Sequence, residues 1–120
     1  MANATQTDNA TFLRGTQVSA ADGTVAFSTV YPGWYQGRTV HIHVMVHVAG
    51  KSVHTGQLFF DDASTDALYA ANAPYSTRSA RDTRNANDGI YQGGGAGSVL
   101  AVAKAGAGLS AKLAMAVKTA

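Results

Sequence analysis

The chain has 120 residues, the size of a single compact domain, and its 46% hydrophobic and 13% charged residues exclude an intrinsically disordered protein. The nine cationic residues are scattered between Arg14 and Lys118 and leave a net charge of only +2, so the sequence indicates no nucleic-acid-binding surface. Because cysteine is absent, disulfides and thiolate chemistry are excluded, and any metal must be held by nitrogen and oxygen atoms.

No segment of the sequence has the pattern of a membrane span or a signal peptide. The apolar runs, such as 44–48, are far shorter than the roughly 20 residues that a membrane helix needs. Residues 1–10 have neither a basic start nor an apolar centre, so we expect no signal peptide in this chain and no membrane partner. We predict a flexible tail at 1–10 and one domain at 11–120.

The domain begins with two predicted strands joined by a tight turn. Apolar residues favour strands at 12–18 and 25–30. The Asp22-Gly23 pair between them is typical of a hairpin, since both residues tolerate positive φ angles. A second turn is expected at Pro32-Gly33.

Residues 38–49 have the clearest strand pattern in the chain. Histidines occupy alternate positions, while the opposite face is apolar and is predicted to enter the core. A turn at 49–51 leads into a second strand at 52–60, so a long hairpin is expected. The apolar face comprises Val40, Ile42, Val44, Val46 and Val48.

A single helix is expected after this hairpin. Residues 61–64 contain typical N-cap residues, and the helical body at 65–71 should end before Asn72 and Pro74.

The rest of the sequence predicts little regular structure. The polar, glycine-rich residues 72–97 predict a long irregular loop, and 98–103 with 109–117 predict a closing hairpin. The expected fold is therefore all-β, an antiparallel β-sandwich with one short helix and a long irregular loop.

Two histidines are spaced for metal binding. His41 and His43 are two residues apart on the predicted strand, so their side chains leave the same face roughly 6.5–7 Å apart along the chain. Imidazoles in this arrangement can converge on one ion. The alternative interpretation is a half-exposed strand whose outer face carries polar residues.

The residues just before the histidines supply further candidate groups. The phenolate of Tyr35 would be a hard anionic oxygen donor of the kind that suits ferric iron. Arg38 could stabilise a nearby anion or a developing negative charge. The alternatives are an aromatic turn packed on the sheet for Tyr35 and a surface charge for Arg38.

Four other residues could extend a metal site but have simpler interpretations. His47 and His54 are more simply partly exposed strand histidines, and Asp61 and Asp62 are more simply helix caps.

Several stretches resemble the intradiol ring-cleavage dioxygenases, in particular the secreted, single-chain branch related to protocatechuate and catechol dioxygenases. The resemblance extends over nearly everything from Thr11 to the C-terminus. The stretches are FLRG at 12–15, DG at 22–23, YPGWYQGRTVHIHV at 31–44, GQLFF at 56–60, APYSTR at 73–78 and RDTRNANDG at 81–89.

The resemblance implies a β-sandwich that binds one Fe(III) and opens catechol-like aromatics to muconates with O2. It implies that Tyr35, His41 and His43 are metal ligands, and that Tyr35 moves aside when the diol binds. It also implies that Arg38 stabilises charge on the substrate and that Gln57 lines the substrate pocket.

One expected ligand of the family has no counterpart in this chain. Family members have another tyrosine ligand well upstream of the FLRG stretch, whereas the first tyrosine here is Tyr31. With one phenolate and two imidazoles, ferric affinity should fall, so impaired activity is expected. The alternative is a truncated or degenerate β-sandwich that binds a partner without catalysis.

Loss of upstream structure would also expose strand edges, so self-association into a homo-oligomer is expected. Extracellular localisation follows from the family resemblance alone.

Overall fold

The computed structural model describes residues 13–118, so the predicted tail at 1–10 lies outside the described residues. These residues form two compact units, 13–31 and 32–118. Every residue of the predicted metal site belongs to the second unit.

Residues 13–31 keep the predicted turn but not the predicted strands. Gly23 adopts a φ of 87°, and the amide of Ala20 donates to the carbonyl of Thr24. No strand forms at 13–18 or 25–30. The side-chain amide of Gln17 donates to the carbonyl of Ala26 and accepts from the backbone amide of Ala26, and these two bonds link the arms. The prediction of two strands here is wrong: a side chain, and not a backbone ladder, joins the extended arms.

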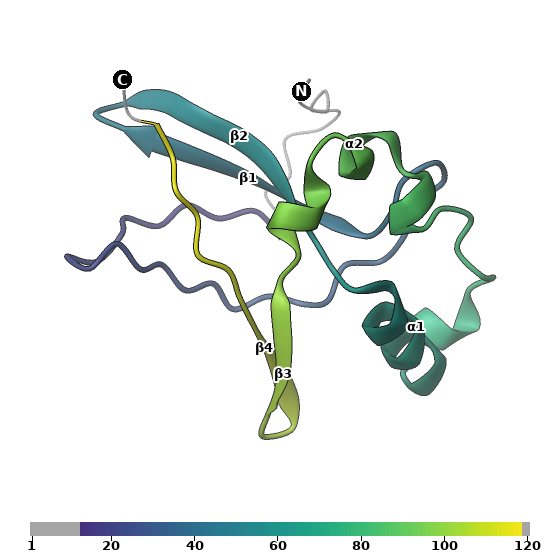
Figure 1. The fold of residues 1–120 in the computed structure, drawn as a ribbon. Coiled ribbons are helices and arrows are strands. Elements are labelled where there is room, and N and C mark those ends of the chain that lie inside the picture. The colour runs from purple at the N-terminus through teal and green to yellow at the C-terminus, as the bar shows by residue number, and fades with distance from the viewer. Residues whose placement is uncertain (1–12, 119–120) are drawn as a thin grey trace. The chain divides into compact units, whose positions relative to one another are not determined.

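The predicted long hairpin is confirmed. It consists of β1 (His41–Val48) and β2 (Lys51–Phe59), paired antiparallel with a register shift between Val46 and His47 (Figure 1). Ala49 and Gly50 both have positive φ angles, 52° and 77°, which is the backbone of the two-residue turn that matches the twist of paired strands.

The apolar face of β1 is less buried than its pattern predicts. Val40, directly before the strand, is buried, whereas Val44 and Val46 are half-buried and Val48 is 40% exposed. Burial therefore decreases along β1 toward its turn, and only the start of the predicted core face lies in the core.

The predicted helix is confirmed as α1 (Asp62–Ala71). Asp61 is its N-cap and accepts a hydrogen bond from the amide of Ser64, while Asn72 is its C-cap. The interpretation of Asp61 as a helix cap is therefore confirmed.

The long loop contains short helical turns that the sequence pattern did not predict. They are η1 (Tyr75–Thr77), η2 (Asn85–Asn87), α2 (Gly89–Gln92) and η3 (Gly95–Ser98).

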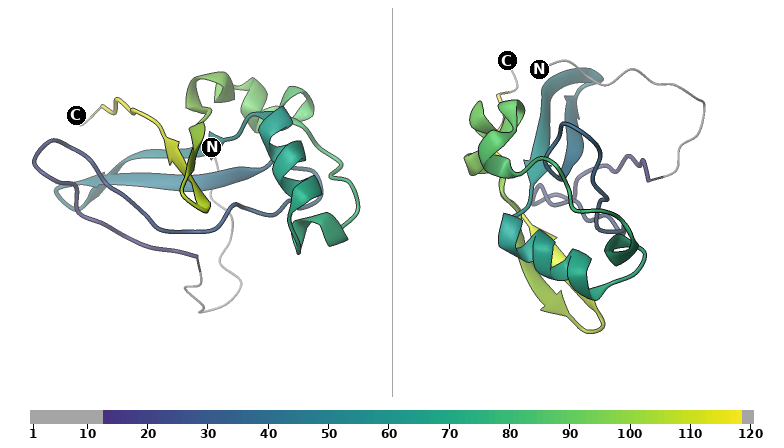
Figure 2. Two further views of the ribbon diagram at one scale, coloured as in Figure 1. Left: turned by 90° about the horizontal axis from the view of Figure 1, so that it is seen from below. Right: turned by 90° about the vertical axis from the view of Figure 1, so that its right-hand side faces the viewer.

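The closing hairpin is confirmed, but its first strand lies later in the chain than the expected 98–103 and its second strand ends earlier than the expected 109–117. β3 (Ala101–Ala105) and β4 (Gly108–Lys112) form a second antiparallel two-stranded sheet. The all-β class with antiparallel strands is thus confirmed. In the second unit, α1 and α2 lie toward the open end of the β1–β2 hairpin, away from its turn (Figure 2).

The small apolar core lies where β2 ends. Phe59 is 2% exposed and packs edge-on against Tyr91 of α2, with ring centroids 5.1 Å apart. The amide of Leu100 donates to the carbonyl of Phe59, which joins the start of β3 to the end of β2. The open end of the hairpin is thereby joined to α2 and to the start of β3. Over residues 13–118, no helix has the length and apolarity that crossing a bilayer requires.

Candidate metal centre

Tyr35 lies on a tight turn directly before β1. The turn is at Gln36-Gly37, where Gly37 has a φ of 84° and the amide of Arg38 donates to the carbonyl of Tyr35. The turn expected at Pro32-Gly33 is therefore found a few residues later, at Gln36-Gly37, where glycine allows the positive φ.

The turn is held from the long loop. Arg78 lies over the ring of Trp34 at 4.3 Å and donates to its carbonyl, and the carboxylate of Asp82 accepts from the amide of Gly37. These contacts bracket Tyr35, so its position depends on loop residues more than 40 positions away in sequence.

His41 presents one nitrogen to Tyr35. Its Nδ1 lies 2.7 Å from the carbonyl oxygen of Thr39, which can only accept, so Nδ1 carries the proton. Nε2 then has a lone pair, and it lies 3.1 Å from the hydroxyl oxygen of Tyr35. Burial lowers the pKa of His41 below 6.5. The charges of Arg38 and His43 also lower this pKa, whereas the hydrogen bond to the carbonyl of Thr39 raises it. The imidazole is therefore held neutral, the form that binds metal.

His43 lies beside His41 on the same face of β1. Their ring centroids are 5.0 Å apart at an interplanar angle of 78°. In the strand register His43 is opposite Gln57 of β2, and His41 is opposite Phe59. The structure therefore brings Tyr35, His41 and His43 together, with the ring of His41 contacting the rings of both other residues.

The donor set fits a hard, oxidised metal ion. It combines two imidazoles with one phenol oxygen, and the lone pair of His41 is already directed at that oxygen. Within residues 13–118, no group of three His, Cys, Asp or Glu side chains is placed to hold a metal. A site at this position therefore depends on Tyr35 as its anionic donor.

Arg38 lies at the edge of this cluster, and each of its three guanidinium nitrogens contacts a different residue. Nε forms an ion pair with Asp88 at 2.9 Å, and one terminal nitrogen donates to the side-chain oxygen of Gln57. The other terminal nitrogen lies 3.5 Å from Nε2 of His41. The guanidinium thus places its positive charge beside the imidazole of His41.

Asp88 is the buried residue of this region that sequence reasoning missed. Its side chain is fully buried, and it accepts hydrogen bonds from the amides of Thr39, Ile90 and Tyr91 as well as from Arg38. Burial by itself would raise the pKa of Asp88, but the hydrogen bonds from Arg38, Tyr91 and Thr39 outweigh it and lower the pKa below 3.8. The carboxylate is therefore ionised at neutral pH.

A signal for Asp88 was present in the sequence. An aspartate two residues before Ile90-Tyr91 is a typical N-cap, which would have predicted α2.

Asn85 holds the residue next to Arg38. It accepts from the hydroxyl of Thr39 at 2.6 Å and donates to the carbonyl of Phe60 at 2.8 Å. The backbone amide of Asn85 donates to the carboxylate of Asp62, which also forms an ion pair with Arg81. Asp62 therefore serves the packing of the loop on α1 and not the candidate metal centre.

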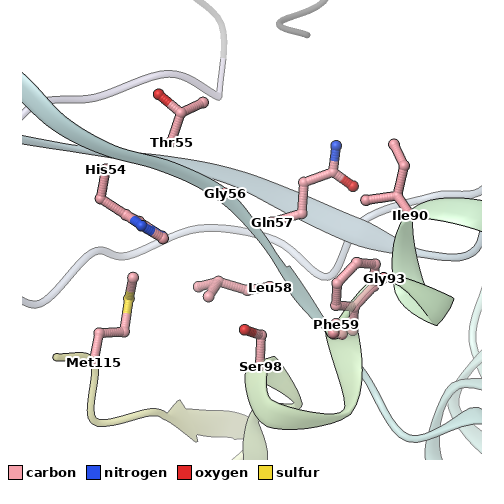
Figure 3. A pocket seen from close by; sticks show the side chains of 12 residues that line it. His54, Thr55, Gly56, Gln57, Leu58, Phe59, Ile90, Gly93, Ser98 and Met115 are labelled. Carbon is pink, nitrogen blue, oxygen red and sulfur yellow. The ribbon is translucent and has the colours of Figure 1, made fainter. Parts of the chain in front are cut away.

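The remaining histidines lie away from the cluster. His47 is exposed beside the register shift of β1. His54 points to the opposite side of β2 from Gln57 and borders a separate hollow of about 220 Å³ with Leu58, Ser98 and Met115 (Figure 3). Gln57 touches this hollow, but its side-chain oxygen accepts from Arg38.

Several solved structures are similar to this chain, and two of them are dioxygenases by description. One is an intradiol ring-cleavage dioxygenase from Tetranychus urticae, with 37% identity over 92% of this chain and a TM-score of 0.84. The other is described as a dioxygenase, with 37% identity over 92% of this chain and a TM-score of 0.85. The chain spans 55% of the length of each. No protein-family model and no curated protein matches it.

The identity and the shared fold agree with the family resemblance that the motifs around Tyr35 and His41 carry. Over the part that aligns with these structures, the chain belongs to the intradiol ring-cleavage dioxygenase family.

Proposed function

We propose that this chain carries the iron-binding part of an intradiol dioxygenase that acts on catechol-like substrates with O2. Tyr35, His41 and His43 would hold Fe(III). The observation that carries the proposal is the approach of the Tyr35 oxygen to the unprotonated nitrogen of His41, beside the ring of His43. The family resemblance independently implies that these three residues are metal ligands.

When bound, ferric iron would supply the Lewis acidity that makes a catechol dianion reactive toward O2, so that the ring opens to a muconate. Tyr35 is 52% exposed, and its turn leaves room for outward movement of the phenol. Once displaced, its oxygen would take up a proton from the incoming diol.

Arg38 would act on the substrate itself. One of its terminal nitrogens faces the position beside His41, so it can donate to an anionic oxygen of the bound diol. Gln57 would hold the other terminal nitrogen and limit the rotation of the guanidinium. The two residues together would orient the substrate and stabilise its negative charge.

The donor set also predicts weak iron binding. Three protein donors with one phenolate offset less of the ferric charge than a set with a second phenolate would. Low activity at limiting iron is therefore expected, and high iron should restore it. Self-association of the chain remains a prediction that gel filtration would check.

The test is reconstitution with ferric iron in air, followed by metal analysis, a visible spectrum and an assay of muconate formation from catechol. We expect coloured protein that forms muconate. His43→Ala should abolish colour and iron retention, whereas His47→Ala, on the same strand, should retain both. Folded wild-type protein that stays colourless and iron-free would refute the proposal and favour a non-catalytic binding module.

A further inference from the structure

The carboxylate of Asp88 has four hydrogen-bond donors, divided evenly between its two oxygens. Oδ1 accepts from the amides of Ile90 and Tyr91, at 3.0 and 2.9 Å, and so caps α2. Oδ2 accepts from Nε of Arg38 at 2.9 Å and from the amide of Thr39 at 2.8 Å. One oxygen therefore serves the helix, and the other serves the residues that lead into β1.

This division determines how the guanidinium of Arg38 is oriented. A planar guanidinium held at Nε by Asp88 and at one terminal nitrogen by Gln57 has two of its three nitrogens occupied. The third is then the nitrogen directed at His41. Without the contact between Nε and Asp88, the guanidinium plane could rotate about its hydrogen bond to Gln57. The third nitrogen would then no longer be directed at His41.

The carboxylate of Asp88 is a well-defined partner for Arg38 because it is buried, and because the segment around it is hydrogen-bonded to the rest of the unit. The side chain of Asp88 is 0% exposed, while that of Arg38 is 18% exposed. Asn85, three residues earlier, is buried and bonded to Thr39 and to the backbone of Phe60. A short charged hydrogen bond in such surroundings defines direction better than one in solvent.

We propose that Asp88 is the positioning residue of Arg38, with Oδ2 turning the guanidinium so that one terminal nitrogen faces the substrate position beside His41. The inference rests on the proposed function, because the substrate that Arg38 would meet is the catechol of that proposal. Asp88 itself touches neither the candidate ligands nor the substrate position in the contacts described above.

The first test uses isotope-labelled, metal-free wild-type protein. The Nε–H signal of Arg38 should be resolved in the nuclear magnetic resonance spectrum and exchange slowly with water, because Oδ2 holds it. An Nε–H that exchanges as fast as that of an exposed arginine would overturn the proposal. This readout needs neither iron nor catechol, so it separates a failure of the positioning role from a failure of the proposed function.

The second test compares Asp88→Asn with Asp61→Asn. Asparagine can still cap α2 through its side-chain oxygen. Its side-chain nitrogen, which would take the place of Oδ2, cannot accept hydrogen bonds from Arg38 and Thr39. Asp61 is a matched control because it is also an N-cap aspartate, and the described hydrogen bonds of its side chain come only from Ser64. Both variants are checked for folding by circular dichroism before use.

We expect Asp88→Asn to lose the protected Nε–H signal and to lower kcat for catechol roughly 10²-fold, the scale of a misplaced catalytic group, with iron content unchanged. Asp61→Asn should match the wild type in all three. Folded Asp88→Asn that keeps both the Nε–H signal and kcat would overturn the proposal. If Asp88→Asn does not fold, the wild-type exchange measurement decides the question. Wild-type protein with a protected Nε–H but no turnover would refute only the catechol function.

Discussion

The hydroxyl oxygen of Tyr35 lies 3.1 Å from Nε2 of His41, and the proton of that imidazole is held on the other nitrogen by the carbonyl of Thr39. The Tyr35 hydroxyl therefore donates to Nε2, and the two candidate donor atoms lie side by side. This relationship makes Tyr35 and His41 prepared donors and leads to the first prediction.

Tyr35→Phe should remove the only anionic donor of the cluster. Ferric affinity is expected to fall by more than roughly tenfold, and the phenolate-to-iron absorption band should disappear. A ferric titration followed in the visible range measures both. Tyr75→Phe is the control, because its ring stacks on Tyr69 at 5.1 Å and phenylalanine keeps that stacking. A Tyr35→Phe protein that retains the band would show that another tyrosine is the ligand.

Arg38→Gln should impair turnover without releasing iron. The substitution removes the positive charge beside His41, and loss of one preorganised donor to a developing anion costs roughly 10²–10³-fold in kcat. Steady-state kinetics and metal analysis on the same sample measure the two effects. Arg84→Gln is the control, since Arg84 pairs with Asp66 on the surface of α1. Equal kcat values for Arg38→Gln and wild type would contradict the role of Arg38.

Asp88 should contribute to an acid dependence of stability. Its pKa is lowered below 3.8 in the folded protein, so its stabilising effect is complete above about pH 4 and is lost as the pH falls through the folded pKa. We expect Asp88→Asn to lower the free energy of unfolding by roughly 1–3 kcal/mol near neutral pH, and the difference from wild type to shrink in acid. Urea unfolding at several pH values tests this, and a difference that stays constant with pH would contradict it.

Gly95→Ala should destabilise the core at the end of β2. A Cβ atom at Gly95 would lie 2.7 Å from the ring of Tyr91 and 2.9 Å from that of Phe59, and overpacking of this kind costs roughly 1–3 kcal/mol. Gly97→Ala is the control in the same turn, because a Cβ there meets nothing within 4 Å. Thermal unfolding compares the two. Equal loss of stability in both variants would indicate a backbone effect and not a steric one.

Local patterns predicted much of the second unit. Alternation along 38–49 and the expected turn at 49–51 were sufficient for the β1–β2 hairpin, and Asp61 was sufficient for the start of α1. The strands expected within residues 13–31 failed because alternation cannot reveal whether a backbone partner is present. There the side chain of Gln17 joins the two arms instead.

The sequence by itself contained the motifs that resemble the family. It also contained the candidate donors, because Tyr35, Arg38, His41 and His43 lie within nine residues and the spacing of the histidines on a strand places both on one face. Only the tertiary structure decided how Arg38 is oriented. Its anchor, Asp88, lies 50 residues further along the chain, and the loop contacts that hold the Tyr35 turn come from more than 40 residues away. Periodicity and spacing report on neighbours in sequence, whereas a buried ion pair between distant segments exists only once packing has brought them together.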